Sequence, residues 1–264
     1  MIEDGSLPGI RVLRPSAGVA EIRLDHPERL NAVDEITFGA LGRALDAIEA
    51  DGAVRVVLLA GEGRAFCAGA NYKRHASGDR TPDEMQAYID VLLDGCERLR
   101  TFARPIVAVV QGYAVGIGLE MALNCDFVIA AETAQFGFPE IERATFVGGG
   151  VTRTLPRLVG LARAREMIMF GERLTGPDAL AAGLVSRCVP DAELRTRALA
   201  FAERLARQAP APIGFAKRLL NSDGDMPVAR AAERAAVVAC MATEDWKEGV
   251  RSFAEKRPPV YEGR

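Results

Sequence analysis

Short apolar runs alternate with longer stretches of helical periodicity in the first half of the chain. Residues 19–24 alternate apolar and polar positions as a half-buried strand does, and residues 54–60 form a mostly apolar run typical of a buried strand. Two more apolar runs predict strands at 126–130 and 106–110. The predicted helices between them span 34–51, 82–103 and 116–124. This alternation favours an α/β domain with a largely parallel sheet.

The pattern changes after about residue 155. The remaining chain is rich in Ala, Leu, Arg and Glu and has no long β-branched run, which predicts a helical region. The expected helical segments are 157–170, 177–183, 191–208, 211–220 and 228–254. The prolines of residues 209–213 separate two of them. Because a helical tail with long apolar faces often packs on another subunit, an oligomer is expected.

Composition narrows the classes of protein that fit. The chain has 264 residues, 49% hydrophobic and 26% charged, with a net charge of -3, so it shows no electrostatic signature of nucleic-acid binding. No uncharged apolar run approaches the roughly 18 residues of a membrane span, and the N-terminus does not resemble a signal peptide. Five scattered cysteines without metal or disulfide spacing favour a reducing, cytoplasmic location. The chain has only two histidines, which disfavours both a metal site and a Ser-His-Asp catalytic triad.

A glycine-bearing turn joins the strand at 106–110 to the helix that begins near Gly116. Glycine lets a ligand approach the backbone, and the free N–H groups of a helix start favour negative charge on an oxygen. Read alone, such a turn is more often a packing feature, and Gly-x-Gly is weak support for a dinucleotide site.

Two carboxylates follow this turn. Glu120 stands among apolar residues on a helix with no polar stripe, so its carboxylate is expected to be buried and to need a partner, a raised pKa or a function. A structural ion pair is the alternative. Glu140 follows Pro139 in a loop, and this position by itself predicts a solvent-exposed acid. Two carboxylates in different surroundings can serve as acid and base or hold one water.

The segment 61–71 leaves a strand through glycine and offers the small residues Ala68, Gly69 and Ala70. A backbone without bulky side chains can supply a second oxyanion donor, although a compact loop that covers the sheet is the alternative. Cys67, in the same segment, is expected to be a buried, inert thiol.

These segments together resemble the crotonase superfamily, which is the enoyl-CoA hydratase/isomerase family. The resemblance covers most of the chain and rests on the order and spacing of several motifs. They occupy residues 26–33, 65–71, 112–126, 134–150 and 248–257. The resemblance implies a spiral of β-β-α repeats with the acyl-CoA site in residues 1–200, then a C-terminal helical oligomerisation region in residues 201–264. A homotrimer or homohexamer is implied as well.

The resemblance also implies roles for individual residues. Glu120 and Glu140 match the acid/base pair, the N–H groups of Ala70 and Ile117 match the oxyanion donors, and Gly148 matches a glycine beside the catalytic water. The implied contacts to coenzyme A are Arg29, Ala32, Ala68, Phe253 and Lys256, the last two often across a subunit boundary. Coenzyme A enters as part of the substrate, and no permanent cofactor, metal, nucleic acid or membrane is expected.

The sequence departs from the family pattern at several positions. Asn71 replaces the usual Asp, Ile117 replaces the middle glycine of Gly-Gly-Gly, and residues 147–150 read Val-Gly-Gly-Gly instead of Pro-Gly-Ala-Gly. Glu142 and Arg143 occur near the expected acyl chain, where hydratases tend to be apolar. These two charges weaken the case for simple fatty enoyl substrates.

The leading hypothesis is hydration of a 2-enoyl-CoA thioester. Enoyl-CoA isomerisation and a specialised acyl-CoA lyase or hydrolase reaction are the alternatives on the same fold. A non-catalytic scaffold is less favoured because both glutamates are present, and a nucleotide-dependent dehydrogenase lacks its glycine fingerprint. Residues 72–103 are expected to wall the acyl pocket, with residues 72–83 as a mobile lid.

Overall fold

The computed structural model describes residues 5–71 and 80–264. At its centre is a seven-stranded sheet with the order β1-β2-β3-β4-β5-β7-β10. Its strands are β1 (Gly5–Leu7), β2 (Ile10–Ser16), β3 (Val19–Leu24), β4 (Val56–Gly61), β5 (Ile106–Val110), β7 (Phe127–Ala131) and β10 (Arg187–Val189). The strands from β3 to β10 are parallel, whereas β1, β2 and β3 are antiparallel to one another in turn. The expected, largely parallel sheet is therefore confirmed.

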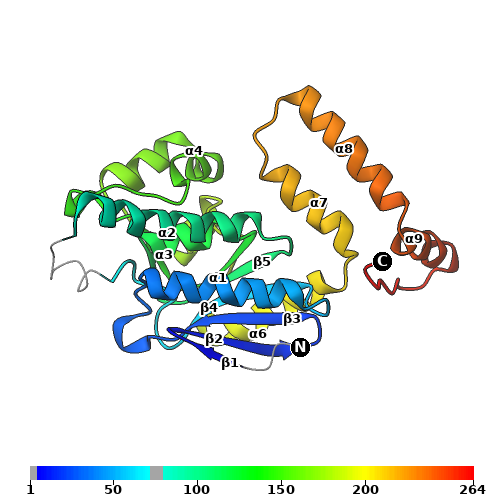
Figure 1. The fold of residues 1–264 in the computed structure, drawn as a ribbon, viewed down its shortest axis with the longest axis horizontal. Helices are drawn as coiled ribbons and strands as arrows, with labels where there is room; N and C mark the ends of the chain where they lie inside the picture. Colours follow the sequence, from blue (N-terminus) through cyan, green and yellow to red (C-terminus); the bar gives the residue numbers. More distant parts are fainter. Residues whose placement is uncertain (1–4, 72–79) are drawn as a thin grey trace.

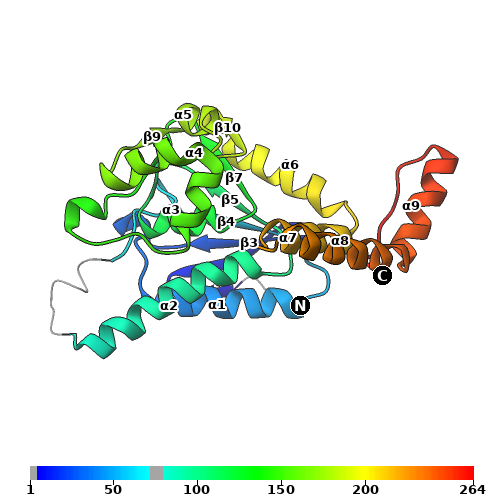
Figure 2. The same cartoon turned by 90° about the horizontal axis from the view of Figure 1, so that it is seen from above.

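Helices cover both faces of this sheet. Every residue of β4 and β5 is buried, as their apolar sequences predict. Helices α1 (Glu35–Ala50) and α2 (Pro82–Thr101) lie on one side, and α6 (Leu194–Ala206) lies on the other (Figure 2). Each of the first two helices begins at a side-chain cap, which Asp34 supplies for α1 and Thr81 for α2. The alternation of strand and helix is thus a layered α/β arrangement.

A second, three-stranded sheet positions the short helix α3 (Ile117–Leu123). Its strands are β6 (Tyr113–Val115), β8 (Gln135–Gly137) and β9 (Leu174–Thr175), in the order β6-β8-β9. Helix α3 starts two residues after β6 and contacts both α2 and α4 (Val151–Met169). Every residue of α3 is buried, so Glu120 lies in the interior.

The C-terminal third differs from its sequence prediction in three places. Helix α4 begins at Val151 instead of residue 157, and the region expected to be helical also contains β9 and β10. The segment 228–254 is two helices: the first ends at Met241, and Thr243 caps the second by accepting a hydrogen bond from Trp246 N. The helices beyond α4 are α5 (Gly176–Ala181), α6, α7 (Pro210–Leu220), α8 (Met226–Met241) and α9 (Glu244–Glu255).

Helices α7, α8 and α9 project from one end of the sheet body (Figures 1 and 2). The buried Lys217 anchors α7, because its Nζ donates to Asp126 Oδ2 at 2.8 Å and to two backbone carbonyls at 3.1 Å. The expected boundary between an acyl-CoA-binding core of residues 1–200 and an oligomerisation region of residues 201–264 stays a prediction. Among the described residues, no helix is both long and apolar enough to span a bilayer.

Candidate active site

A cavity of about 750 Å³ opens between α2, the start of α3 and the loop that follows β8. Its wall on α2 is apolar and consists of Met85, Tyr88, Ile89, Leu92 and Leu93. The expected wall of residues 72–103 is thus confirmed only between Met85 and Leu93, while most of the expected lid lies outside the described residues. The structure brings six of the predicted site residues into this cavity: Ala68, Ala70, Ile117, Glu120, Glu140 and Gly148.

Glu120 reaches the cavity from the buried helix α3 and is only 4% exposed. Its Oε1 accepts a hydrogen bond from the Gly148 N–H at 2.7 Å. The pKa of Glu120 is raised to about 7, mainly by burial; the Gly148 hydrogen bond opposes the rise, and the negative charge of Glu140 adds to it. The carboxylate therefore changes its charge near neutral pH, where a general base is most effective.

Glu140 lies in the turn that precedes the 3-10 helix η3 (Ile141–Arg143) and is 7% exposed. Its Oε2 is buried without a hydrogen bond to a described residue. Burial raises the pKa of Glu140, and its own backbone N–H and the positive charge of Arg143 moderate the rise. The expectation from the isolated motif, a solvated loop acid, is wrong because β8 brings Glu140 inward before the turn.

Glycine at the start of α3 lets Glu140 lie against the helix terminus. Gly116 has φ 57°, and a Cβ placed there would lie 2.5 Å from Glu140 Oε1. The left-handed backbone and the absent side chain are both required at this position. Glu140 is consequently held next to the first N–H groups of α3.

Two backbone N–H groups occupy the positions expected of oxyanion donors. Ile117 is the first residue of α3, so its N–H has no partner within the helix. Neither this N–H nor that of Ala70 donates to a backbone carbonyl within residues 5–71 and 80–264. A Cβ on Gly118 would lie 2.4 Å from the Cys67 carbonyl oxygen, so the first turn of α3 packs directly on the segment that carries Ala70.

The segment with Ala68 and Ala70 is held by a tight turn near the N-terminus. Leu30 and Asn31 both have positive φ angles. The Asn31 side chain donates to the carbonyls of Glu62 and Ala65 at 2.9 and 2.8 Å, and Ala68 N donates to Leu30 O at 3.0 Å. The motif at residues 26–33 therefore has a structural role in positioning the donor loop.

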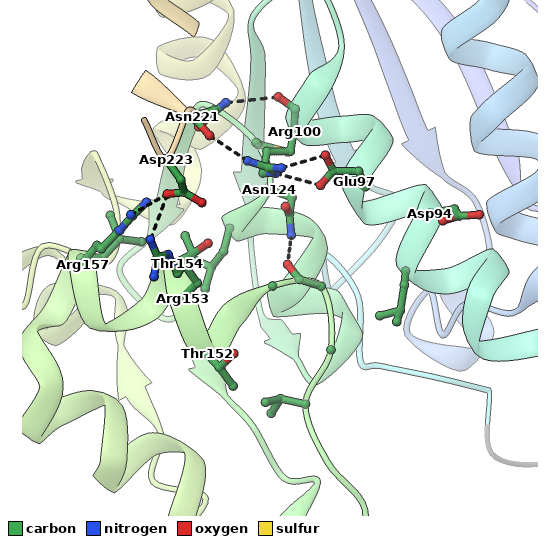
Figure 3. A pocket seen from close by; sticks show the side chains of 18 of the residues that line it. Asp94, Glu97, Arg100, Asn124, Thr152, Arg153, Thr154, Arg157, Asn221 and Asp223 are labelled. Atoms are coloured by element: carbon green, nitrogen blue, oxygen red, sulfur yellow. Dashed lines mark hydrogen bonds and ion pairs between the residues drawn. The ribbon is translucent and has the colours of Figure 1, made fainter. Parts of the chain in front are cut away.

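A second cavity, of about 660 Å³, lies behind the glycine loop and shares Leu93, Phe146, Val147 and Gly148 with the first. Its arginines form internal ion pairs: Arg100 with Glu97, and Arg153 and Arg157 with Asp223 (Figure 3). Asn124 donates to the carbonyls of Glu120 and Gly149, both at 2.8 Å. Sequence reasoning missed Asn124, which the four-residue spacing from Glu120 on the helix could have indicated. Asn124 therefore links the end of helix α3 to the glycine loop.

Comparison with known proteins now decides the family. The sequence profile of the enoyl-CoA hydratase/isomerase family matches residues 14–264. The chain belongs to the enoyl-CoA hydratase/isomerase family. A probable enoyl-CoA hydratase of Rhizobium meliloti (strain 1021) is 37% identical over 248 residues, which are 93% of this chain and 95% of that protein. A mitochondrial enoyl-CoA hydratase of Pongo abelii is 36% identical over 241 residues, 90% of this chain and 82% of that one.

The fold agrees with that family. A crystal structure of an enoyl-CoA hydratase from Bacillus anthracis superimposes with a TM-score of 0.92 at 33% identity, covering 97% of this chain and all of that one (100%). The α/β crotonase fold with C-terminal helices is thus confirmed. The chain is an enzyme of the hydratase/isomerase family, and the family acts on coenzyme A thioesters.

Not all of the residues expected to contact coenzyme A line the cavity of this enoyl-CoA hydratase/isomerase. Ala68 lines the cavity, whereas Arg29 and Ala32 lie in the neighbouring turn on either side of the cavity residue Leu30. Phe253 and Lys256 do not line it, because they belong to the projecting helix α9 and its C-terminal cap (Figure 1).

The departures from the family pattern have distinct surroundings. Asn71 donates from Nδ2 to Asp34 Oδ2 at 3.3 Å, so it supports the cap of α1. Arg143 lines the cavity as expected, but Glu142 does not: a Cβ on Gly171 would lie 3.3 Å from its Oε1. The expectation that Glu142 lies near the acyl chain is wrong, because η3 turns its side chain toward the loop after α4. Cys67 is fully buried, which raises the pKa of its thiol to about 12 and makes it inert as predicted.

Proposed function

We propose that this protein adds water to the double bond of a 2-enoyl-CoA thioester. The observation that carries the proposal is the convergence, in one largely apolar cavity, of two buried carboxylates and two backbone N–H donors. The thioester carbonyl would bind between the N–H groups of Ala70 and Ile117. These donors stabilise the negative charge that develops on the thioester oxygen, and losing one such donor typically costs roughly 2.7–4 kcal/mol.

The carboxylates supply the proton transfers. Glu120 positions the water and accepts its proton as the oxygen bonds to the β-carbon, and Glu140 delivers a proton to the α-carbon. The near-neutral pKa of Glu120 suits the first task, and the raised pKa of Glu140 suits the second. The net reaction adds one water, and a proton passes from Glu120 to Glu140 to restore the starting state. Neither a metal nor a nucleophilic side chain has a role in this scheme.

The projecting helices support an oligomer, either a homotrimer or a homohexamer. Phe253 is 88% exposed and, with Lys256, lies outside the cavity of its own chain. Helices α8 and α9 also expose apolar side chains, namely Val237, Val238, Met241, Trp246 and Val250. Burying them against a second copy would let Phe253 and Lys256 contact coenzyme A bound to that copy. Light scattering of the purified protein, with Phe253→Asp as the variant, tests this assembly.

The thiols of the protein bear on its location in the cell. The five cysteines are free, which supports a reducing compartment, and we infer the cytoplasm.

Loss of the enoyl-thioester absorbance of crotonyl-CoA tests the hydration directly. We expect the wild-type protein to hydrate crotonyl-CoA and Glu140→Gln to be slower by orders of magnitude, with coenzyme A binding unchanged by calorimetry. If the wild-type protein binds coenzyme A but moves the double bond of a 3-enoyl-CoA instead, the isomerase alternative replaces this proposal. Near wild-type activity of Glu140→Gln would remove Glu140 from the mechanism.

A further inference from the structure

Two cations line the catalytic cavity in addition to the two carboxylates. The charged residues among its described lining are Glu120, Glu140, Arg143 and Arg173. Arg143 lies at the end of η3, and its Nη1 donates to the Pro139 carbonyl at 3.1 Å, one residue before Glu140. The guanidinium therefore lies on the Glu140 side of the cavity.

Arg173 reaches the same side from a remote part of the chain. It precedes β9, which pairs with β8, and a Cβ placed on Gly137 would lie 2.7 Å from Arg173 Cγ. The aliphatic part of Arg173 thus crosses β8 just before the turn that carries Glu140. Arg173 forms no hydrogen bond or ion pair with any residue that the structure describes. Its guanidinium is available to a ligand.

Among the described residues that line the cavity, the charge balance favours an anion. Because the pKa of Glu120 is raised to about 7, its carboxylate does not carry a full negative charge at neutral pH. Glu142, the acid nearest to Arg143 along the chain, points toward Gly171 and does not line the cavity. In this described part of the lining, whose walls are mostly apolar, the two arginines carry more charge than the ionised carboxylates.

We propose that Arg143 and Arg173 bind a carboxylate on the acyl group, so that the preferred substrate is a 2-enoyl-CoA whose acyl chain ends in a carboxylate. Guanidinium groups match a carboxylate with paired N–H donors, which makes arginine suited to this task. The proposal rests on the proposed hydration, because it names the substrate class of that same cavity.

The position of the cations points to the acyl group and not to the phosphates of coenzyme A. Both arginines flank Glu140, which serves the α-carbon in the proposed reaction. The pantetheine arm places the phosphates far from that carbon. An anion beside Glu140 therefore belongs to the acyl portion of the substrate.

The test compares kcat/KM for two 2-enoyl-CoA substrates of equal chain length, one ending in a methyl group and one in a carboxylate. We expect the wild-type enzyme to prefer the carboxylate, and Arg173→Gln and Arg143→Gln each to lower that preference about tenfold, a value discounted for solvent exposure. Arg165→Gln, an exposed arginine of α4 outside the cavity, is the matched control and should leave the preference unchanged.

The same pair of acyl groups on N-acetylcysteamine, which carries no phosphate, separates the two sources of negative charge. The preference and its loss in the variants should persist with these thioesters. A contrary result is that the variants lose the same activity toward both acyl groups, and only with the coenzyme A thioesters. That result would show that the arginines bind the phosphates and would overturn the proposal. Hydration of the methyl-ended substrate without any preference would also overturn it and leave the proposed hydration intact. Turnover of neither substrate would instead refute the hydration itself.

Discussion

Replacing Glu120 by Gln should make the protein more stable at alkaline pH while it loses activity. Burial raises the pKa of Glu120 from 4.5 to about 7. At 1.36 kcal/mol for each pH unit, this shift corresponds to about 3 kcal/mol of folding free energy. Since the folded state binds the proton more tightly than the unfolded state, the free energy of unfolding falls as pH rises from about 4.5 to 7. A glutamine stays neutral throughout, and its amide oxygen still accepts the Gly148 N–H.

Urea unfolding at pH 5 and pH 8, at one fixed protein concentration, measures this difference. Glu120→Gln should exceed the wild-type stability by less than about 1 kcal/mol at pH 5 and by about 3 kcal/mol at pH 8. Glu49→Gln, at an exposed position on α1, should show the same small difference at both pH values. Equal stability of the wild type and Glu120→Gln at pH 8 would refute the conclusion that the fold holds Glu120 at an energetic cost.

Three further substitutions test the framework and the site. Lys217→Met leaves the half-buried Asp126 without its cationic partner, so urea unfolding should show a loss of about 3 kcal/mol, and a loss below about 1 kcal/mol would contradict the anchoring role. Gly116→Ala should displace the Glu140 carboxylate and lower kcat about 100-fold with the circular dichroism spectrum retained, whereas unchanged kcat would show that the close approach is not needed. Ile117→Pro removes one N–H at a helix position that accepts proline and should lower kcat roughly 10²–10³-fold. The matched Ile117→Val variant keeps that N–H, and equal kcat in the two variants would exclude it as an oxyanion donor.

The main sheet and the burial of Glu120 could be predicted from the sequence because their signals are local. The strand at 19–24 and the strand at 106–110 have the predicted bounds, and both are dominated by apolar positions. Glu120 is flanked by apolar residues on all sides of a short helix, so no orientation of that helix could expose it. This local pattern alone predicts its burial.

The remaining features depend on contacts between distant segments. Strands β6, β8, β9 and β10 have two or three residues each, too few for a periodicity to show. Glu140 is buried only because β8 pairs with β6, and Arg173 enters the cavity only because β9 pairs with β8. No local pattern distinguishes Arg173 from an ordinary surface arginine.

Hydration of crotonyl-CoA in ¹⁸O-labelled water tests the central proposal most directly. Product analysis by mass spectrometry should show one ¹⁸O atom in a 3-hydroxyacyl-CoA product of the wild-type enzyme, formed orders of magnitude more slowly by Glu140→Gln. A wild-type enzyme that binds the thioester but forms no labelled product, or a Glu140→Gln variant that forms it at the wild-type rate, would contradict the proposal that the two buried glutamates add water to an enoyl thioester.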